Sequence, residues 1–339
     1  MSRLRGSLFV SATLVAVAAC SDSTGKVTAP ASQSGSGVSF DAAPDHGNGP
    51  AFIVHQMPTQ AQAKIGNLGG GGSGSGIYYH GGPVLLAGAR VAAVYWSSTT
   101  IYTNGPTPGT FGAGSGDGSL VGTFLRTLGG SPYFNINSTY TDGAGHHIAN
   151  AVAYTQYWAN NTNAPSGTQS VTDASMLAML ASGFSSGALT YDPNTLYAIF
   201  TSGQVNLGGG FGTQYCAYHG YGTVTVGGVS KIVLYAAMPY DYAYPSACSS
   251  GFASPNADAG ANAEVNTLAH ETEETTTDMY LNAWYDRRGY ENADKCAWTW
   301  GTTYHTANGG TANMKIAGVD YLIQRNWVNA GSGGCALSY

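Results

Sequence analysis

Charged residues are scarce in this 339-residue chain. It carries 12 Lys and Arg against 18 Asp and Glu, which makes 9% charged residues and a net charge of −6. A nucleic-acid-binding surface needs clustered Lys and Arg side chains that neutralise phosphates. Because cations are few and the balance is negative, the composition excludes nucleic acid as an expected partner.

The N-terminus lacks an apolar run long enough to span a membrane. Residues 8–18 are apolar, but a spanning helix needs about 20 residues. The run follows Arg3 and Arg5 and leads to small residues, which predicts a secretory signal over residues 1–19. The sequence Val-Ala-Ala-Cys ending at Cys20 resembles the bacterial lipoprotein cleavage box, in which the cysteine is lipidated.

We therefore expect an exported protein, a cell-surface or outer-membrane lipoprotein whose only membrane contact is a lipid anchor at Cys20. The alternative is an ordinary cleaved signal and a secreted protein.

Large apolar residues are few between the signal and residue 76. This segment is rich in Ser, Gly, Ala and Pro and ends in a Gly-rich run over residues 69–76. Such a composition buries too little surface to offset its chain entropy, so residues 20–76 are expected to form a flexible tether. Ordered structure is expected to begin at Ile77. The remaining residues 77–339, about 260, suffice for one domain with a sizeable core.

Closely spaced cysteines are also lacking. Beyond Cys20 the chain contains Cys216, Cys248, Cys296 and Cys335. A zinc site built on cysteines is not expected, because such sites use close cysteine pairs. An even number of cysteines in an exported chain predicts two disulfides. Three pairings exist, of which the sequential one closes the shortest loops.

The apolar pattern predicts alternating strands and helices. Strand-length apolar runs occupy residues 90–96, 195–201, 231–237 and 321–327. Helical spacing occurs over residues 119–128, 171–184 and 261–277. Strands separated by helices indicate a single layered α/β or α+β domain with a central mixed sheet.

Glutamate is absent from most of the chain. The five glutamates are Glu264, Glu271, Glu273, Glu274 and Glu291. Residues 270–274 read His-Glu-Thr-Glu-Glu, an H-E-x-x-E pattern. On a helix, His270 and Glu274 project from the same face. The apolar stripe that includes Val265 and Leu268 lies opposite, so one face is expected to be buried while the other lines a cleft.

This pattern predicts a metal site. The spacing is that of the H-E-x-x-H metalloproteases, with a carboxylate in place of the second histidine. His270 and Glu274 are the expected ligands of a zinc ion, and Glu271 the expected general base. Asp294 is the favoured third ligand, because a disulfide at Cys296 would fix its position. The alternative third ligands are Asp278, Glu291 and His219. Calcium is the alternative metal, since oxygen ligands outnumber nitrogen.

A solvated acidic helix face is the competing interpretation of the glutamates. Glu271, Glu273 and Glu274 lie toward the C-terminus of the expected helix, where the helix dipole disfavours each negative charge by roughly 0.3–1 kcal/mol. Their mutual repulsion adds to this cost. A bound cation would relieve both effects, which favours the metal site.

Several segments resemble the phosphate-induced protein 1, or EXORDIUM-like, family. They are residues 79–85 (YHGGPVL), 94–96 (VYW), 192–202 (DPNTLYAIFTS), 216–220 (CAYHG) and 318–322 (GVDYL) running on to Cys335. The resemblance spans roughly residues 77–339. It implies an extracellular protein and agrees with the sequential disulfide pairing.

The plant members of this family are cell-wall-associated, growth-related proteins that lack the H-E-x-x-E residues. In this respect the chain resembles bacterial relatives, which carry a stretch similar to residues 268–296.

Two functions are therefore expected. The first is an exported metal-dependent hydrolase, most simply a zinc peptidase, acting on an extracellular peptide, protein or cell-wall substrate. The second is a non-catalytic surface protein that binds wall glycans or a partner through some of its 23 tyrosines, with a structural metal or none.

Overall fold

The computed structural model describes residues 52–68 and 76–339. All of these residues belong to one compact unit. The expected signal peptide, Cys20 and most of the expected tether lie outside the described residues.

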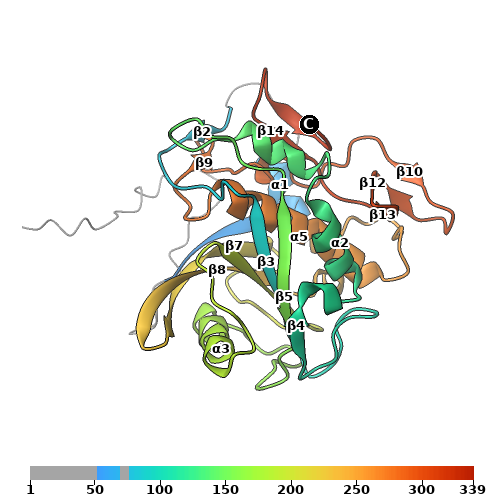
Figure 1. Cartoon of the computed structure of the whole chain (residues 1–339). Helices are drawn as coiled ribbons and strands as arrows, with labels where there is room; N and C mark the ends of the chain where they lie inside the picture. Colours follow the sequence, from blue (N-terminus) through green and yellow to red (C-terminus); the bar gives the residue numbers. More distant parts are fainter. Residues whose placement is uncertain (1–51, 69–75) are drawn as a thin grey trace, which may run out of the picture. The chain divides into compact units, whose positions relative to one another are not determined.

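A mixed sheet forms the centre of the fold (Figure 1). Its seven described strands run in the order β1-β7-β8-β6-β3-β5-β4. The strands are β1 (Phe52–Pro58), β3 (Ala89–Trp96), β4 (Phe111–Ala113), β5 (Val152–Trp158), β6 (Thr195–Thr201), β7 (Tyr215–Val226) and β8 (Val229–Met238). The pairs β3–β5, β3–β6 and β6–β8 are parallel, and the pairs at β1, β7 and β4 are antiparallel. The predicted layered domain with a central mixed sheet is confirmed.

Helices pack on both faces of this sheet. They are α2 (Leu120–Leu128), α3 (Asp173–Ser186) and α5 (Ala259–Thr277). Along β3, Val91 and Ala93 belong to the core with α2 and α5, whereas Ala92 and Val94 belong to the core with α3. Side chains of a strand alternate between its faces, so a strand covered on both sides is apolar throughout. This explains the continuous apolar runs of the sequence.

Shorter elements connect and flank these layers. The helical ones are α1 (Gln60–Ile65), α4 (Pro245–Cys248), η1 (Gly114–Gly116), η2 (Phe134–Thr139), η3 (Asp241–Ala243) and η4 (Asp294–Cys296). Two-stranded sheets pair β2 (Tyr78–Tyr79) with β9 (Trp284–Tyr285), β10 (Tyr304–His305) with β11 (Thr311–Ala312), β12 (Met314–Ile316) with β13 (Val319–Tyr321), and β14 (Asn326–Val328) with β15 (Gly334–Ala336).

The predicted strand over residues 321–327 is wrong. The segment divides between β13 and β14, and residues 322–325 belong to neither. Here two backbone N–H groups bond to side chains instead of a neighbouring strand. The N–H of Ile323 donates to Asn313 Oδ1, and that of Gln324 donates to Asn266 Oδ1. Apolar periodicity carries no sign of such partners.

The structure also differs from the expected tether. Residues 52–68 fall within the predicted flexible segment, yet they form β1 and α1, so ordered structure begins before Ile77. β1 pairs with β7 along the edge of the central sheet. Thr59 caps α1, its hydroxyl accepting a hydrogen bond from the N–H of Gln62. The apolar residues of β1 do not predict a strand by composition, because the segment around them is polar on average.

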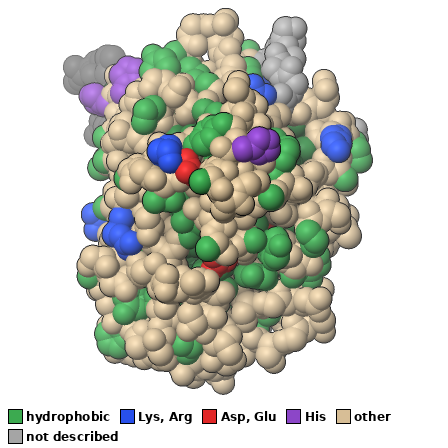
Figure 2. All heavy atoms as spheres, turned by 90° about the vertical axis from the view of Figure 1, so that its right-hand side faces the viewer, with side chains coloured by type: hydrophobic (Ala, Val, Ile, Leu, Met, Phe, Trp, Pro, Cys, Tyr) green, Lys and Arg blue, Asp and Glu red, His purple; other side chains and the backbone are tan. Residues whose placement is uncertain are grey.

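The two predicted disulfides are confirmed, and they pair sequentially as Cys216–Cys248 and Cys296–Cys335. The first ties β7 to α4, and the second ties η4 to β15. No helix among the described residues has the length and apolar character needed to cross a membrane. Figure 2 shows a face on which charged side chains are sparse, as the composition implies.

Candidate metal centre

Helix α5 is buried on all sides. Every residue from Gly260 to Thr277 is buried, so the expected half-exposed helix lining a cleft is wrong. The helix packs against the sheet through β7 and β8, and against α2, η2 and η3 on its other sides. The side chains of His270, Glu271 and Glu274 therefore meet partners from β7 and η4 instead of solvent.

Two carboxylates from separate segments approach one nitrogen of His270. Glu274 Oε1 lies 3.1 Å from His270 Nε2, one helical turn along α5. Asp294 Oδ1, from η4, lies 3.5 Å from the same nitrogen. The N–H of Asp294 donates to Glu274 Oε1 at 2.9 Å. The structure thus brings together the three predicted ligands, all fully buried.

The other oxygen of Asp294 is held by His55. Nε2 of His55 lies 2.7 Å from Asp294 Oδ2, and its Nδ1 lies 3.6 Å from Glu291 Oε1. His55 comes from β1, where it is the direct cross-strand partner of His219 on β7. Glu291, an alternative third ligand, is thereby placed at the edge of the same cluster.

His219 gathers a second set of carboxylates. Its Nδ1 lies 3.0 Å from Glu271 Oε2 and 3.6 Å from Glu274 Oε2. Its Nε2 lies 3.7 Å from Glu291 Oε2. Like the other members of the cluster, His219 is buried. The predicted general base, Glu271, is therefore hydrogen-bonded to a histidine and adjacent to the ligand pair on α5.

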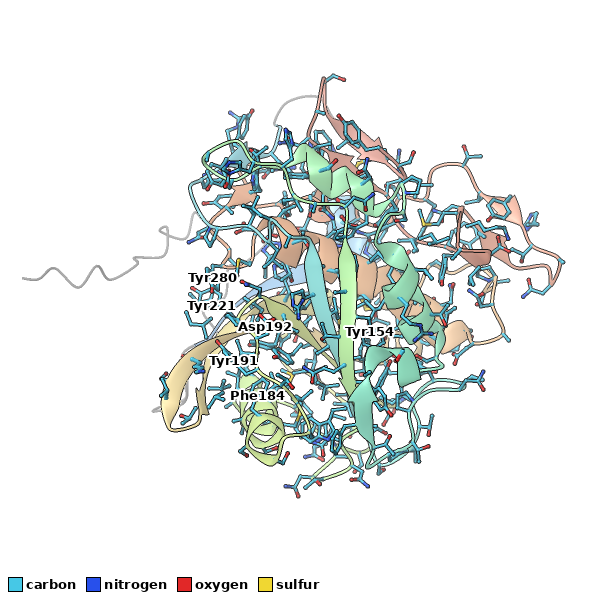
Figure 3. All side chains as sticks on the ribbon, in the orientation of Figure 1. Tyr154, Phe184, Tyr191, Asp192, Tyr221 and Tyr280 are labelled. Carbon is cyan, nitrogen blue, oxygen red and sulfur yellow. A yellow bond between two sulfur atoms is a disulfide. The ribbon has the colours of Figure 1, made fainter. Side chains whose placement is uncertain are left out.

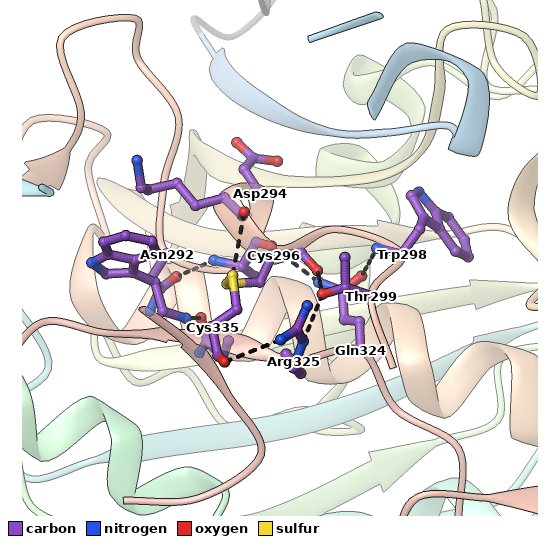
Figure 4. The surroundings of a disulfide bond; sticks show 12 residues. Asn292, Asp294, Cys296, Trp298, Thr299, Gln324, Arg325 and Cys335 are labelled. Carbon is purple, nitrogen blue, oxygen red and sulfur yellow. Dashed lines mark hydrogen bonds between the residues drawn. A yellow bond between two sulfur atoms is a disulfide. The ribbon is translucent and has the colours of Figure 1, made fainter. Parts of the chain in front are cut away.

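Two supports fix this arrangement. Gln324 Nε2 lies 2.7 Å from His270 Nδ1 and also donates to the carbonyl of Ala293, so it sets the orientation of the His270 ring. Cys296 follows Asp294 by two residues, and Figure 4 shows its disulfide with Cys335. This disulfide anchors η4, as the sequence predicts.

Burial and mutual contact shift the proton affinities of the cluster. Burial, together with the neighbouring carboxylates, raises the pKa of Glu291 well above its usual range. Burial likewise raises the pKa of Glu271 well above its usual range, although the nearby His270 opposes this. Burial alone would lower the pKa of His270, but the adjacent Glu274 and Asp294 raise it well above its usual value.

His55 and His219 respond in opposite directions. Burial opposes the charged form of His55, but the contact with Asp294 raises its pKa. Burial lowers the pKa of His219 well below its usual value, and the nearby His55 and His270 add to this. Despite burial, His55 and His270 hold the pKa of Asp294 below its usual range. The metal-free cluster thus combines an ionised part around Asp294 with a neutral His219.

The remaining acids of this region have other partners. Asp278, an alternative third ligand, accepts the backbone N–H groups of Asn282 and Ala283 at 2.6 Å each and so shapes the turn after α5. Burial raises its pKa to about 7. Glu273 accepts a hydrogen bond from Asn326 Nδ2 at 2.8 Å.

The cluster contains two groups whose ligand atoms lie within 4.8 Å of one another. They are His55 with Glu274 and Asp294, and His219 with Glu271 and Glu274. Several polar atoms of these buried residues find no hydrogen-bond partner among the described residues, including His219 Nε2, Glu271 Oε1 and Glu274 Oε2. Unpartnered buried polar atoms are costly unless a further group satisfies them. The donor set therefore fits a divalent cation.

Neither His55 nor Gln324 is predicted as a site residue from the sequence. His55 lies in the segment predicted as a tether. The apolar residues around it in β1 (FIVHQMP) are of the kind that indicates a strand. Gln324 stands in the segment predicted as a strand, and no spacing rule connects it to His270.

Fold and site together define a disulfide-linked α/β domain with a buried histidine–carboxylate cluster. Residues 129–324 match the phosphate-induced protein 1 conserved region. This match covers more than half of the chain, which belongs to the phosphate-induced protein 1 family. It includes α5, His219, Asp294 and Gln324, but not His55. A search of the curated proteins and one of the solved structures gave no match.

Proposed function

We propose that this chain is an exported metal-dependent hydrolase, a zinc peptidase acting on an extracellular peptide, protein or cell-wall substrate. The observation that carries the proposal is the approach of Glu274 and Asp294 to His270 Nε2, at 3.1 and 3.5 Å. Ligand atoms about 2.0–2.1 Å from a tetrahedral zinc ion lie roughly 3.4 Å from each other. These separations support a cation bound by His270, Glu274 and Asp294 together. We call this position the first site.

The chemistry of the donors favours zinc over calcium. Calcium takes oxygen ligands, whereas imidazole nitrogen suits zinc. His55, His219 and His270 all lie in the cluster, and His270 directs Nε2 at both carboxylates of the first site. A calcium ion would not be expected to take these imidazole nitrogens as ligands.

The protein groups have distinct roles in this proposal. When bound, zinc supplies a Lewis acid and lowers the pKa of a water molecule. Glu271, next to His270 in sequence, would accept a proton from the attacking water through Oε1, which has no hydrogen-bond partner among the described residues. His55 would hold Asp294 as an outer-shell partner, as hydrogen bonds do for ligating carboxylates.

Export is part of the proposal. Two disulfides within the described residues support an oxidising compartment outside the cytoplasm. The N-terminal signal pattern and Cys20 support a bacterial-type lipoprotein at the cell surface or outer membrane. The H-E-x-x-E residues support a place among the bacterial relatives of the family.

Complete burial of the cluster favours a second candidate, a non-catalytic extracellular protein with a structural metal. His270, Glu271, Glu274 and Asp294 are 0% exposed, so hydrolysis requires the segments over α5 to open. The half-buried Tyr191, Tyr221 and Tyr280 (Figure 3) would offer such a protein aromatic surface for glycans.

One set of variants distinguishes the two candidate functions. The full chain is purified, its zinc content is measured, and hydrolysis is assayed on casein and a peptide library. Under the first candidate, Glu274→Ala and Asp294→Ala lose zinc, whereas Glu271→Gln keeps zinc and loses hydrolysis. The matched control is Glu273→Gln, a buried glutamate of the same helix whose Oε2 bonds to Asn326, and it keeps both.

Zinc in the wild type with no hydrolysis of either substrate would favour the structural role. Absence of zinc from the wild type, after growth in zinc-supplemented medium, would overturn both forms of the metal proposal.

A further inference from the structure

We infer that the cluster binds a second divalent cation beside the first, with Glu274 as the bridging ligand and His219 and Glu271 as its other ligands. We call this position, formed by His219, Glu271 and Glu274, the second site. The inference rests on the proposed first site and goes beyond it in stoichiometry and in the role of Glu271.

The two oxygens of Glu274 face different partners. Oε1 lies 3.1 Å from His270 Nε2 and accepts the N–H of Asp294. Oε2 lies 3.6 Å from His219 Nδ1 and has no hydrogen-bond partner among the described residues. A carboxylate with one oxygen in each of two ligand sets can bridge two ions, and paired ions in metalloenzymes lie about 3.5–4 Å apart.

The second site has the donor spacing that a cation requires. His219 Nδ1 is 3.0 Å from Glu271 Oε2 and 3.6 Å from Glu274 Oε2, and one ligand atom from each residue falls within 4.8 Å of the others. These separations bracket the roughly 3.4 Å between ligands of a tetrahedral zinc ion. One imidazole and two carboxylates leave a coordination position for water or a further ligand.

Glu291 lies at the other nitrogen of the His219 ring and is not a ligand of the second site. Its Oε2 lies 3.7 Å from His219 Nε2, and neither of its oxygens has a hydrogen-bond partner among the described residues although the side chain is only 1% exposed. A single cation at the first site leaves these oxygens and Glu274 Oε2 unsatisfied. A second cation beside His219 Nδ1 satisfies Glu274 Oε2.

Occupancy of the second site changes the role of Glu271. With the site empty, Glu271 is available to take up a proton, as the proposed function requires. With the site filled, the carboxylate is a ligand and no longer a base. We therefore expect hydrolysis to be highest at one cation per chain and to fall when a second cation binds.

The test is a metal titration of the full chain. Metal-free protein is titrated with Co²⁺, followed by visible absorption and electron paramagnetic resonance, and zinc content is measured in parallel after saturation. The wild type is expected to bind two ions, and the second equivalent should weaken the resonance signal of the first through coupling across Glu274. His219→Ala is expected to weaken the second equivalent by at least about 100-fold and keep the first.

His305→Ala, at an exposed histidine outside the cluster, is the matched control and should bind two ions. His219→Gln is measured beside His219→Ala, with circular dichroism to show that both fold. One ion per wild-type chain overturns the second site and leaves the proposed function standing. Two ions without magnetic coupling overturn the bridge. No bound ion in the wild type removes the first site as well.

Discussion

His55 on β1 and His219 on β7 are direct cross-strand partners whose ring centroids lie 5.8 Å apart. Residues opposite each other in an antiparallel pair project from the same face of the sheet. Here His219 reaches Glu271 and Glu274 of α5, and His55 reaches Asp294 of η4. The edge strand β1 thus completes a cluster whose other members come from the family-matched region.

Removing the His55 ring should lower the zinc affinity of the proposed metal centre without abolishing binding. His55→Ala leaves the proposed ligands in place but frees Asp294 Oδ2 from its 2.7 Å contact. Loss of an outer-shell partner reduces metal affinity by about 10–100-fold. Zinc affinity measured by competition with a chromophoric chelator checks this, with His305→Ala as the control. Unchanged affinity would show that His55 does not position Asp294.

The close approach of β1 to β7 depends on Gly220. A Cβ at this position would lie 2.1 Å from the carbonyl oxygen of Ile53, a backbone atom that cannot turn aside. Gly220→Ala should push β1 outward and destabilise the domain by about 1–3 kcal/mol. Chemical unfolding measures the loss, and zinc affinity should fall with it because His55 moves with β1. The control is Gly228→Ala, whose Cβ would meet nothing within 4 Å. Because Gly228 has a positive φ of 78°, the control should lose a smaller amount of stability through backbone strain. Its zinc affinity should not change.

Metal removal should reverse the pH dependence of stability. Burial raises the pKa of Glu271 and Glu291 well above the usual range, and that of Asp278 to about 7. The folded metal-free chain therefore holds protons that the unfolded chain releases above about pH 4.3. Its stability falls as the pH rises through these folded-state pKa values.

The histidines contribute with both signs. The raised pKa values of His55 and His270 give stability that is present below about pH 6.5 and lost as the pH rises. The lowered pKa of His219 acts in the opposite sense. Its contribution to stability is present above about pH 6.5 and is lost as the pH falls through the folded-state pKa of His219. The groups with raised pKa values outnumber His219, whose pKa is lowered. Chelator-treated protein should therefore melt at a higher temperature at pH 5.5 than at pH 8. Zinc-loaded protein should show the opposite order, because metal ligands must be deprotonated.

The disulfide Cys296–Cys335 should stabilise both the domain and the first site. It closes a loop of sequence separation 39, and replacing both cysteines by serine should cost roughly 3–4 kcal/mol. Because η4 carries Asp294 directly before this bridge, zinc affinity should fall as well. Denaturant unfolding and zinc competition on the double variant measure the two effects. A loss of stability with unchanged zinc affinity would separate the bridge from the site.

Local patterns predicted the main elements well. The expected segments 90–96, 195–201 and 231–237 correspond to β3, β6 and β8, and the expected helices correspond to α2, α3 and α5. The prediction worked where apolar periodicity reflects burial on the sheet. It failed over residues 321–327 and 52–68, where side-chain hydrogen bonds and a sheet-edge pairing decide the backbone path.

By itself the sequence determined the members of the α5 motif, the two disulfides and the layered α/β class. Helical spacing fixes that His270 and Glu274 share a face, whatever surrounds them. Only the tertiary structure decided that the helix is buried on every side, that Asp294 reaches His270, and that His55 joins His219. These contacts depend on long-range pairing of β1 with β7 and on the position of η4. Local periodicity contains no information about either.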